Sequence, residues 1–280
     1  MSHRIAATIV LYRPERAAVQ ALLASLAGDV ERIFLYCNAA VPDDWAAGPV
    51  TLLGDGGNRG LGQAYNEAAA AARAAGCDRL ILFDEDSRPP PGMAGRLARA
   101  LDGAGGRVAV VAPRPVADGA VKLPAAAAGA AGLRERAFVI SSGSLIDLAA
   151  FAEIGPFRAD FFIDAIDIEW CFRARARGYR CLMAMEEAMP HRLGRGVLRL
   201  PGLGLSFVEQ PPPRLYTYAR NQMLMMRLPH VPLWWKARVA ATLPLRLLAD
   251  LAGGGRRAQR TALLRGIAAG LRGETGPPAL

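Results

Sequence analysis

A chain of 280 residues fits either one large α/β domain with an appendage or two small domains. Its composition, 52% hydrophobic and 21% charged, excludes global disorder. The net charge of +9 predicts an anionic partner, and nucleotides, anionic lipids and nucleic acids all meet that description.

The four cysteines, at positions 37, 77, 171 and 181, form no C-x-x-C pair and follow no secretory signal. We therefore expect reduced thiols in a cytoplasmic protein. The longest stretch without a charge, residues 17–28, is too short to cross about 30 Å of hydrocarbon. The chain is thus expected to lie on a membrane surface at most.

Short apolar runs alternate with helical patterns in the first part of the chain. Such alternation is typical of parallel sheets, so we predict a doubly wound, mainly parallel α/β sheet flanked by helices. Ligands bind beyond the carboxyl ends of the strands of such sheets, and these ends carry Arg13, Asn38, Asp55 and Asp84. The expected strands are 5–12, 32–36, 50–53, 79–83 and 108–112. One expected helix begins at Pro14, and a second spans residues 62–75.

The second half of the chain has weaker patterns. The Ala- and Gly-rich segment 117–132 predicts a loop, and 138–146 has the apolar character of a strand. Residues 164–177 predict a helix, with acids in its first turn and arginines in its last. Another helical stretch follows three prolines at 211–213. We place a boundary near Pro229, so that a domain of residues 1–228 precedes a basic helical tail of residues 229–280.

The tail carries eight basic residues against Asp250 and Glu274 from position 231 onward. In a helix from 260 to 272, Leu263, Ile267 and Leu271 would share one face, which predicts peripheral contact with the inner face of the cytoplasmic membrane. Nucleic acid is not expected, because the basic residues are interleaved with Leu and Ala and no aromatic stacking platform accompanies them.

Three segments could carry chemistry. Asp84 and Asp86 lie two apart after a buried strand, so an extended backbone would point both carboxylates to one side, where they could hold Mg²⁺ or Mn²⁺. A solvated acidic turn is the alternative. Gly60 and Gly62 open a helix whose N-terminus favours anions, although this segment taken alone is better explained by a capped helix with a flexible loop.

The third segment, residues 161–170, places three acids among aromatic side chains. Crowding beside apolar rings raises the pKa of a carboxyl group, which suits a general base, whereas acid enrichment in a first helical turn is the alternative. His191 could complete a metal site, and Arg220 could neutralise phosphate. A lone histidine, or an arginine on an aromatic helix, is more often structural.

Nine segments in order resemble the family 2 glycosyltransferases with the GT-A fold, and within them the bacterial rhamnosyltransferase group, from about Ile5 to Asn221. The segments are Ile9-Val10-Leu11-Tyr12, Asn58-x-Gly60-x-Gly62-x-x-x-Asn66, Asp84-Glu85-Asp86-Ser87, Ser142-Gly143-Ser144, Ile154-Gly155-x-Phe157, Phe162-Ile163-Asp164-x-x-Asp167-x-Glu169-Trp170-x-x-Arg173, Gly178-Tyr179, His191-x-x-Gly194 and Tyr218-x-Arg220-Asn221.

The resemblance implies that Asp84 contacts the nucleotide sugar, that Asp86 and His191 hold the divalent ion, and that Asp167 is the catalytic base. The other donor contacts that it implies are Tyr12, Asn38, Gly60, Gly62, Asn66 and Arg220, and the implied acceptor contacts are Ser142, Gly143, Glu169 and Trp170.

We therefore expect an inverting, metal-dependent glycosyltransferase of cell-envelope polysaccharide biosynthesis. The resemblance favours dTDP-L-rhamnose as donor and a hydroxyl group of a cell-surface polysaccharide or lipid-linked glycan as acceptor. One alternative keeps the fold and uses a UDP-sugar, such as UDP-galactofuranose or UDP-glucose. The other is a basic surface module whose acidic motifs are purely structural.

Overall fold

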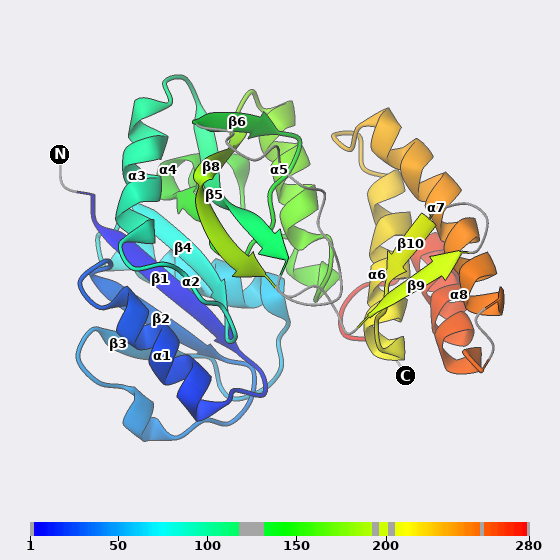
Figure 1. The fold of residues 1–280 in the computed structure, drawn as a ribbon, viewed down its shortest axis with the longest axis horizontal. Coiled ribbons are helices and arrows are strands. Elements are labelled where there is room, and N and C mark those ends of the chain that lie inside the picture. Colours follow the sequence, from blue (N-terminus) through cyan, green and yellow to red (C-terminus); the bar gives the residue numbers. More distant parts are fainter. Residues whose placement is uncertain (1–2, 118–131, 192–195, 201–204, 253–254, 279–280) are drawn as a thin grey trace.

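The computed structural model describes residues 3–117, 132–191, 196–200, 205–252 and 255–278. Figure 1 shows a sheet domain, built from the residues up to His191, beside a smaller helical unit built from residues 196 onward. The expected loop at 117–132 lies almost wholly outside the described residues.

One eight-stranded sheet forms the centre of the first domain. Its strands are β1 (Ile5–Leu11), β2 (Arg32–Cys37), β3 (Val50–Leu53), β4 (Arg79–Asp84), β5 (Val108–Ala117), β6 (Leu133–Arg136), β7 (Leu145–Asp147) and β8 (Arg180–His191), in the order β3-β2-β1-β4-β7-β5-β8-β6. Strands β3, β2, β1 and β4 pair in parallel, as do β5 and β8. Only β7 and β6 pair antiparallel to their neighbours. The mainly parallel sheet is therefore confirmed.

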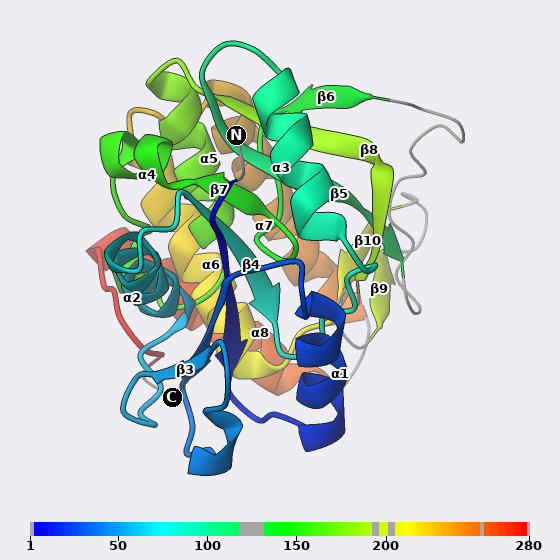
Figure 2. The ribbon, with the colours of Figure 1, turned by 90° about the vertical axis from the view of Figure 1, so that its left-hand side faces the viewer.

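Helices cover both faces of this sheet, which is why its strands read as continuous apolar runs. One face is covered by α1 (Arg16–Leu26) and α3 (Met93–Gly103), the other by α2 (Leu61–Ala74), α4 (Leu148–Ile154) and α5 (Ile166–Ala176), as Figure 2 shows. The layers place the carboxyl ends of the parallel strands at one edge of the domain. In Figure 1 the arrowheads of β5 and β8 point from that edge toward the helical unit.

The helical unit contains a two-stranded sheet of β9 (Val197–Leu200) and β10 (Leu205–Val208) and the helices α6 (Pro212–Met226), α7 (Leu233–Ala252) and α8 (Arg257–Arg272). Glycines let α8 lie directly on α6: a Cβ at Gly266 would lie 2.4 Å from the Tyr216 carbonyl oxygen, and one at Gly270 would lie 2.5 Å from that of Arg220. The expected boundary near Pro229 falls between these two packed helices. No helix among the described residues is long and apolar enough to cross a membrane.

Two sequence-based elements differ from the structure. The strand expected at 138–146 is reduced to β7 at 145–147, because Gly143 (φ 81°) turns the chain and its amide donates to the Leu82 carbonyl (2.7 Å). The helix expected from Asp164 starts at Ile166, because Asp164 and Ala165 have positive φ angles of 68° and 62° that a helix excludes.

Candidate active site

Asp84 is the last residue of β4, and serine hydroxyls fix the turn that follows it. The Asp84 amide donates to Ser87 Oγ (3.0 Å), and a hydrogen bond joins the hydroxyls of Ser87 and Ser142 (2.9 Å). Ser142 is buried beneath this turn, and Gly143 is packed against Pro113 and Met189. Both predicted acceptor contacts are therefore buried next to the turn that follows Asp84.

Glu85 joins the ends of β4 and β1. Its carboxylate accepts hydrogen bonds from the backbone amides of Tyr12 (2.8 Å) and Arg13 (3.3 Å). The Tyr12 ring is 47% exposed and, with Arg13, Pro42 and Trp45, lines an open pocket of about 500 Å³ beyond β1 and β2. The sequence predicted Tyr12 as a donor contact. It did not predict that Glu85 holds the amides of Tyr12 and Arg13, although Glu85 lies within the Asp84-Glu85-Asp86-Ser87 motif.

Several charged groups meet at Asp84. Burial raises the pKa of its carboxyl group, nearby Asp86 raises it further, and His191 and Arg214 oppose the shift. Asp86 itself is exposed. The charges of Asp86, His191 and Arg214 thus all act on the Asp84 carboxyl group at the end of β4.

The residues near Asp84 fit a divalent ion held by few protein ligands. The described residues contain no ready-made group of three or more His, Cys, Asp or Glu side chains arranged for a metal. Mg²⁺ and Mn²⁺ nevertheless suit one or two carboxylates, with water and substrate phosphates completing the shell, and imidazole is an accepted additional ligand. Asp86 and His191 have side chains of these two kinds.

Asp167 lies in the first turn of α5, where two backbone amides hold its carboxylate. Ser141 donates to Oδ2 (3.0 Å) and Ile168 donates to Oδ1 (2.9 Å). Burial outweighs these hydrogen bonds and raises the pKa of Asp167 to about 6, with Asp164 adding to the shift. The carboxylate is therefore suited to accept a proton near neutral pH.

Two side chains, Tyr65 and Arg214, are influenced by the charges of both Asp84 and Asp167. The phenol of Tyr65 is fully buried, which raises its pKa well above the ordinary value, and both carboxylates add to that shift. Arg214 of α6 donates to Asp164 Oδ1 (3.1 Å), and the carboxylates of Asp164, Asp84 and Asp167 together raise the pKa of its guanidinium. Arg214 was not predicted, and no motif of the sequence marks it.

The loop before α5 is strained. Phe162, Asp164 and Ala165 all have φ angles between 62° and 68°, which side chains other than glycine rarely adopt. Such a conformation persists only where surrounding contacts hold it, and here those contacts come from α6.

Asn221 and Arg220 of α6 supply these contacts. Asn221 Nδ2 lies within hydrogen-bonding distance of the carbonyl oxygens of Phe161 (2.9 Å), Ile163 (2.7 Å) and Asp164 (2.9 Å). Arg220 donates to the Phe161 carbonyl (3.0 Å). Both side chains are buried, so the structure places Arg220, predicted as a donor contact, behind the loop that leads to Asp167.

Glu169 and Trp170 lie on α5 but point into the protein. Glu169 is 1% exposed and pairs with Arg173 (2.9 Å) and His230 (2.8 Å). Burial alone would raise the pKa of Glu169, but the hydrogen bonds from His230 and Arg173 outweigh it and lower that pKa. Trp170 is also 1% exposed, and its indole donates to the Gly155 carbonyl (2.9 Å). Neither side chain reaches the open site.

The predicted glycine loop packs against the strained loop. A Cβ at Gly60 would lie 2.5 Å from the Phe162 carbonyl oxygen, and one at Gly62 would lie 2.8 Å from that of Arg158. Asn66 bonds both backbone groups of Phe157 (2.8 and 3.0 Å). On the other side, buried Asn38 accepts from the Arg59 amide (2.9 Å) at the end of β2.

Comparisons with known proteins give one similar sequence and several similar folds. No protein-family model matches the chain. The chain is similar to the dTDP-rhamnosyl transferase RfbF of Shigella flexneri, with 28% identity over 251 residues that cover 83% of each protein.

Solved structures share the fold. A crystal structure of GalNAc-T7 with UDP, GalNAc and Mn²⁺ matches 96% of this chain with a TM-score of 0.63 and 13% identity, and this chain spans 56% of that one. A structure of S. aureus TarS with UDP-GlcNAc matches 97% of this chain and 92% of its own, with a TM-score of 0.57 and 12% identity. These likenesses confirm the fold expected from the sequence.

Proposed function

We propose that this chain, a family 2 glycosyltransferase with the GT-A fold, transfers L-rhamnose from dTDP-L-rhamnose to a hydroxyl group of a glycan or lipid-linked glycan, with inversion of configuration. The similarity to a dTDP-rhamnosyl transferase supports the donor. A cytoplasmic site of action and a role in cell-envelope polysaccharide synthesis are parts of the same proposal.

The observation that carries the proposal is the position of Asp167. Its carboxylate has a pKa of about 6, and its charge acts together with that of Asp84 on Tyr65 and Arg214. In the proposed reaction Asp167 takes the proton of the acceptor hydroxyl, and the acceptor oxygen forms a bond to the anomeric carbon. The bond between that carbon and the diphosphate oxygen breaks, and dTDP leaves.

Other side chains would hold the donor. We propose that Tyr12, Asn38 and Asp84 contact the nucleotide sugar and that Arg214 faces its diphosphate. Asp86 and His191 would hold the divalent ion, Mg²⁺ or Mn²⁺, which neutralises charge on the leaving diphosphate when it is bound.

Buried motif residues would act indirectly. We propose that Gly60, Gly62, Asn66 and Arg220 position the strained loop, because their contacts run to residues 157–162. Ser142, Gly143, Glu169 and Trp170 would shape the acceptor side by fixing the turn after β4 and the orientation of α5.

A donor panel tests the proposal. The full chain is titrated with dTDP-L-rhamnose, UDP-glucose and UDP-galactofuranose in Mg²⁺, in Mn²⁺ and with a chelator, and binding and nucleoside diphosphate release are measured. We expect the tightest binding and fastest release with dTDP-L-rhamnose, and loss of release with the chelator. Preference for a UDP-sugar would reject rhamnose and favour the alternative donor class, and release that survives chelation would reject the metal assignment.

A further inference from the structure

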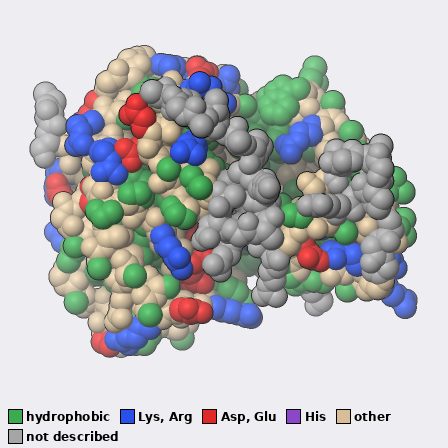
Figure 3. All heavy atoms as spheres, viewed as in Figure 1, with side chains coloured by type: hydrophobic (Ala, Val, Ile, Leu, Met, Phe, Trp, Pro, Cys, Tyr) green, Lys and Arg blue, Asp and Glu red, His purple; other side chains and the backbone are tan. Residues whose placement is uncertain are grey.

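Exposed hydrophobic side chains are concentrated on two C-terminal helices. Of the eight large hydrophobic residues that the described chain exposes, six lie on α7 and α8, so the distribution is not that of an ordinary surface. Figure 3 shows hydrophobic side chains gathered over the start of α7, at the upper right of the view.

The exposed apolar side chains of α7 form a continuous row on that helix, which we call the α7 stripe. Its members recur every three or four residues, so they share one face of the helix. The opposite face carries Trp235, Val239 and Leu243, which are buried in the core. The stripe consists of Leu233, Ala237, Ala241, Pro244, Leu248 and Leu251, all exposed, with exposed Trp234 beside its first turn.

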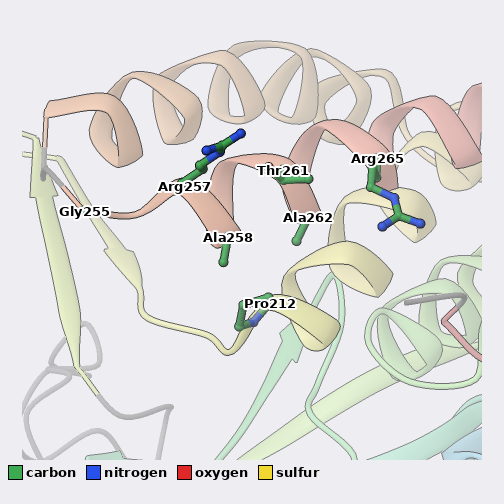
Figure 4. Close-up of a pocket in the computed structure, with 7 residues that line it drawn as sticks. All are labelled: Pro212, Gly255, Arg257, Ala258, Thr261, Ala262 and Arg265. Carbon is green, nitrogen blue, oxygen red and sulfur yellow. The ribbon is translucent and has the colours of Figure 1, made fainter.

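Helix α8 does not provide the apolar face expected from the sequence. Leu263, the centre of that face, is fully buried, and Gly266 and Gly270 hold α8 against α6. The exposed side chains of α8 include Arg257, Arg265 and Arg272, with Leu264 and Leu271 beside two of them. Figure 4 shows two of these arginines on the part of α8 that borders a pocket of about 610 Å³.

The charge around the α7 stripe is positive. Lys236 and exposed Arg238 flank it on the same helix. Of the two acids in this unit beyond position 230, Asp250 is buried between Arg246 and Arg256, and Glu274 pairs with Arg272. An apolar helical face bordered by basic residues is the arrangement that binds anionic lipid surfaces.

We propose that the α7 stripe docks on an anionic lipid bilayer, with the arginines of α8 meeting lipid phosphates nearby. A second copy of the chain is the less suitable occupant, because a symmetric contact would bring two sets of these basic side chains together. Docking through α7 replaces the sequence-based expectation that the helix at 260–272 inserts.

The start of α7 packs against α5, the helix that carries Asp167. Trp234 packs edge-on against Phe172 of α5 (5.8 Å between ring centroids), and His230, just before α7, pairs with Glu169 of α5. Helix α5 carries Asp167. A bilayer on the α7 stripe would therefore lie one helix away from the proposed base. That such a bilayer would carry a lipid-linked acceptor rests on the proposed function.

Vesicle binding by the full chain tests the docking surface. We compare the native chain with Leu248→Glu/Leu251→Glu and, as a charge-matched control, Ala17→Glu/Gln20→Glu on the exposed side of α1. The native chain should sediment with phosphatidylglycerol vesicles and not with phosphatidylcholine vesicles. The α7 variant should lose about tenfold in binding and the α1 variant should bind as the native chain does.

Tryptophan fluorescence gives an independent reading. Trp234 is 50% exposed, whereas Trp45, Trp170 and Trp235 are buried, so lipids brominated in their acyl chains should quench Trp234 selectively. Equal vesicle binding by the native chain and the α7 variant, or no binding by the native chain, would overturn the proposal. So would a native dimer that the α7 substitutions dissociate while vesicle binding is unchanged, because a second copy would then cover the stripe.

The same variants separate this proposal from the proposed function. Binding of dTDP-L-rhamnose should be equal in all three chains. If no chain binds that donor but the pattern of vesicle binding holds, the enzymatic proposal fails and the docking surface stands.

Discussion

Burial gives Asp167 the pKa of about 6 that makes it a useful base, and this sets a pH dependence. A carboxylate accepts a proton only when it is ionised, so activity should be present above pH 6 and lost as the pH falls through that value. We expect log kcat/KM to rise by about one per pH unit below pH 6 and then level off. Donor affinity measured over the same range is the control, and a flat profile from pH 5 to 7 would contradict the assignment.

Asn221 should matter for turnover as well as for stability, because its amide holds the strained loop before Asp167. Gln222 is the matched control: it is buried on the same helix, but its side chain bonds Trp235 (3.1 Å). Asn221→Ala and Gln222→Ala should each cost about 1–3 kcal/mol of unfolding free energy.

Only Asn221→Ala should also lower kcat, by up to about a hundredfold, with donor affinity nearly unchanged, because it releases the base from its position. Equal kcat in the two variants, at matched losses of stability, would show that the loop does not need this clamp.

At the scale of elements, the close contact of α8 with α6 depends on glycine. In Gly270→Ala the added methyl group would meet the Arg220 carbonyl oxygen and Met223 Cβ, both at 2.5 Å, so α8 must shift, at a cost of about 1–3 kcal/mol. Gly103→Ala in α3 adds the same group into open space and should be neutral or stabilise by up to about 1 kcal/mol. Urea unfolding of both variants measures these changes in stability. Similar midpoints would contradict a close contact between α6 and α8 at Gly270.

For the whole molecule, the sequence alone predicts those elements that depend on a local pattern of apolar residues. The strands β1 to β4 and the first helices follow from apolar runs, and Asp84 follows from its place after one of them. The antiparallel pairing of β7 with β4 and β5 was not predicted, because it depends on residues far apart in the chain.

The site was harder to predict where side chains turn inward. Nothing in residue type marks Phe162, Asp164 and Ala165 as left-handed, since their conformation depends on Asn221, more than fifty residues later. The motif around Arg220 likewise does not reveal that its guanidinium is buried behind the loop. The apolar face expected on the helix at 260–272 has Leu263 buried against the rest of the unit, because the helical pattern alone cannot show which face packs against α6.

The most direct test of the central claim is a comparison of native chain and Asp167→Asn, with donor affinity and transfer to acceptor measured on the same preparations. With dTDP-L-rhamnose and Mg²⁺ or Mn²⁺, the native chain should release dTDP and form a rhamnosylated product. Asp167→Asn should bind the donor with nearly the native affinity and transfer no sugar. Transfer at the native rate by Asp167→Asn would contradict the account, and loss of donor binding would move Asp167 from the acceptor side of the reaction to the donor site.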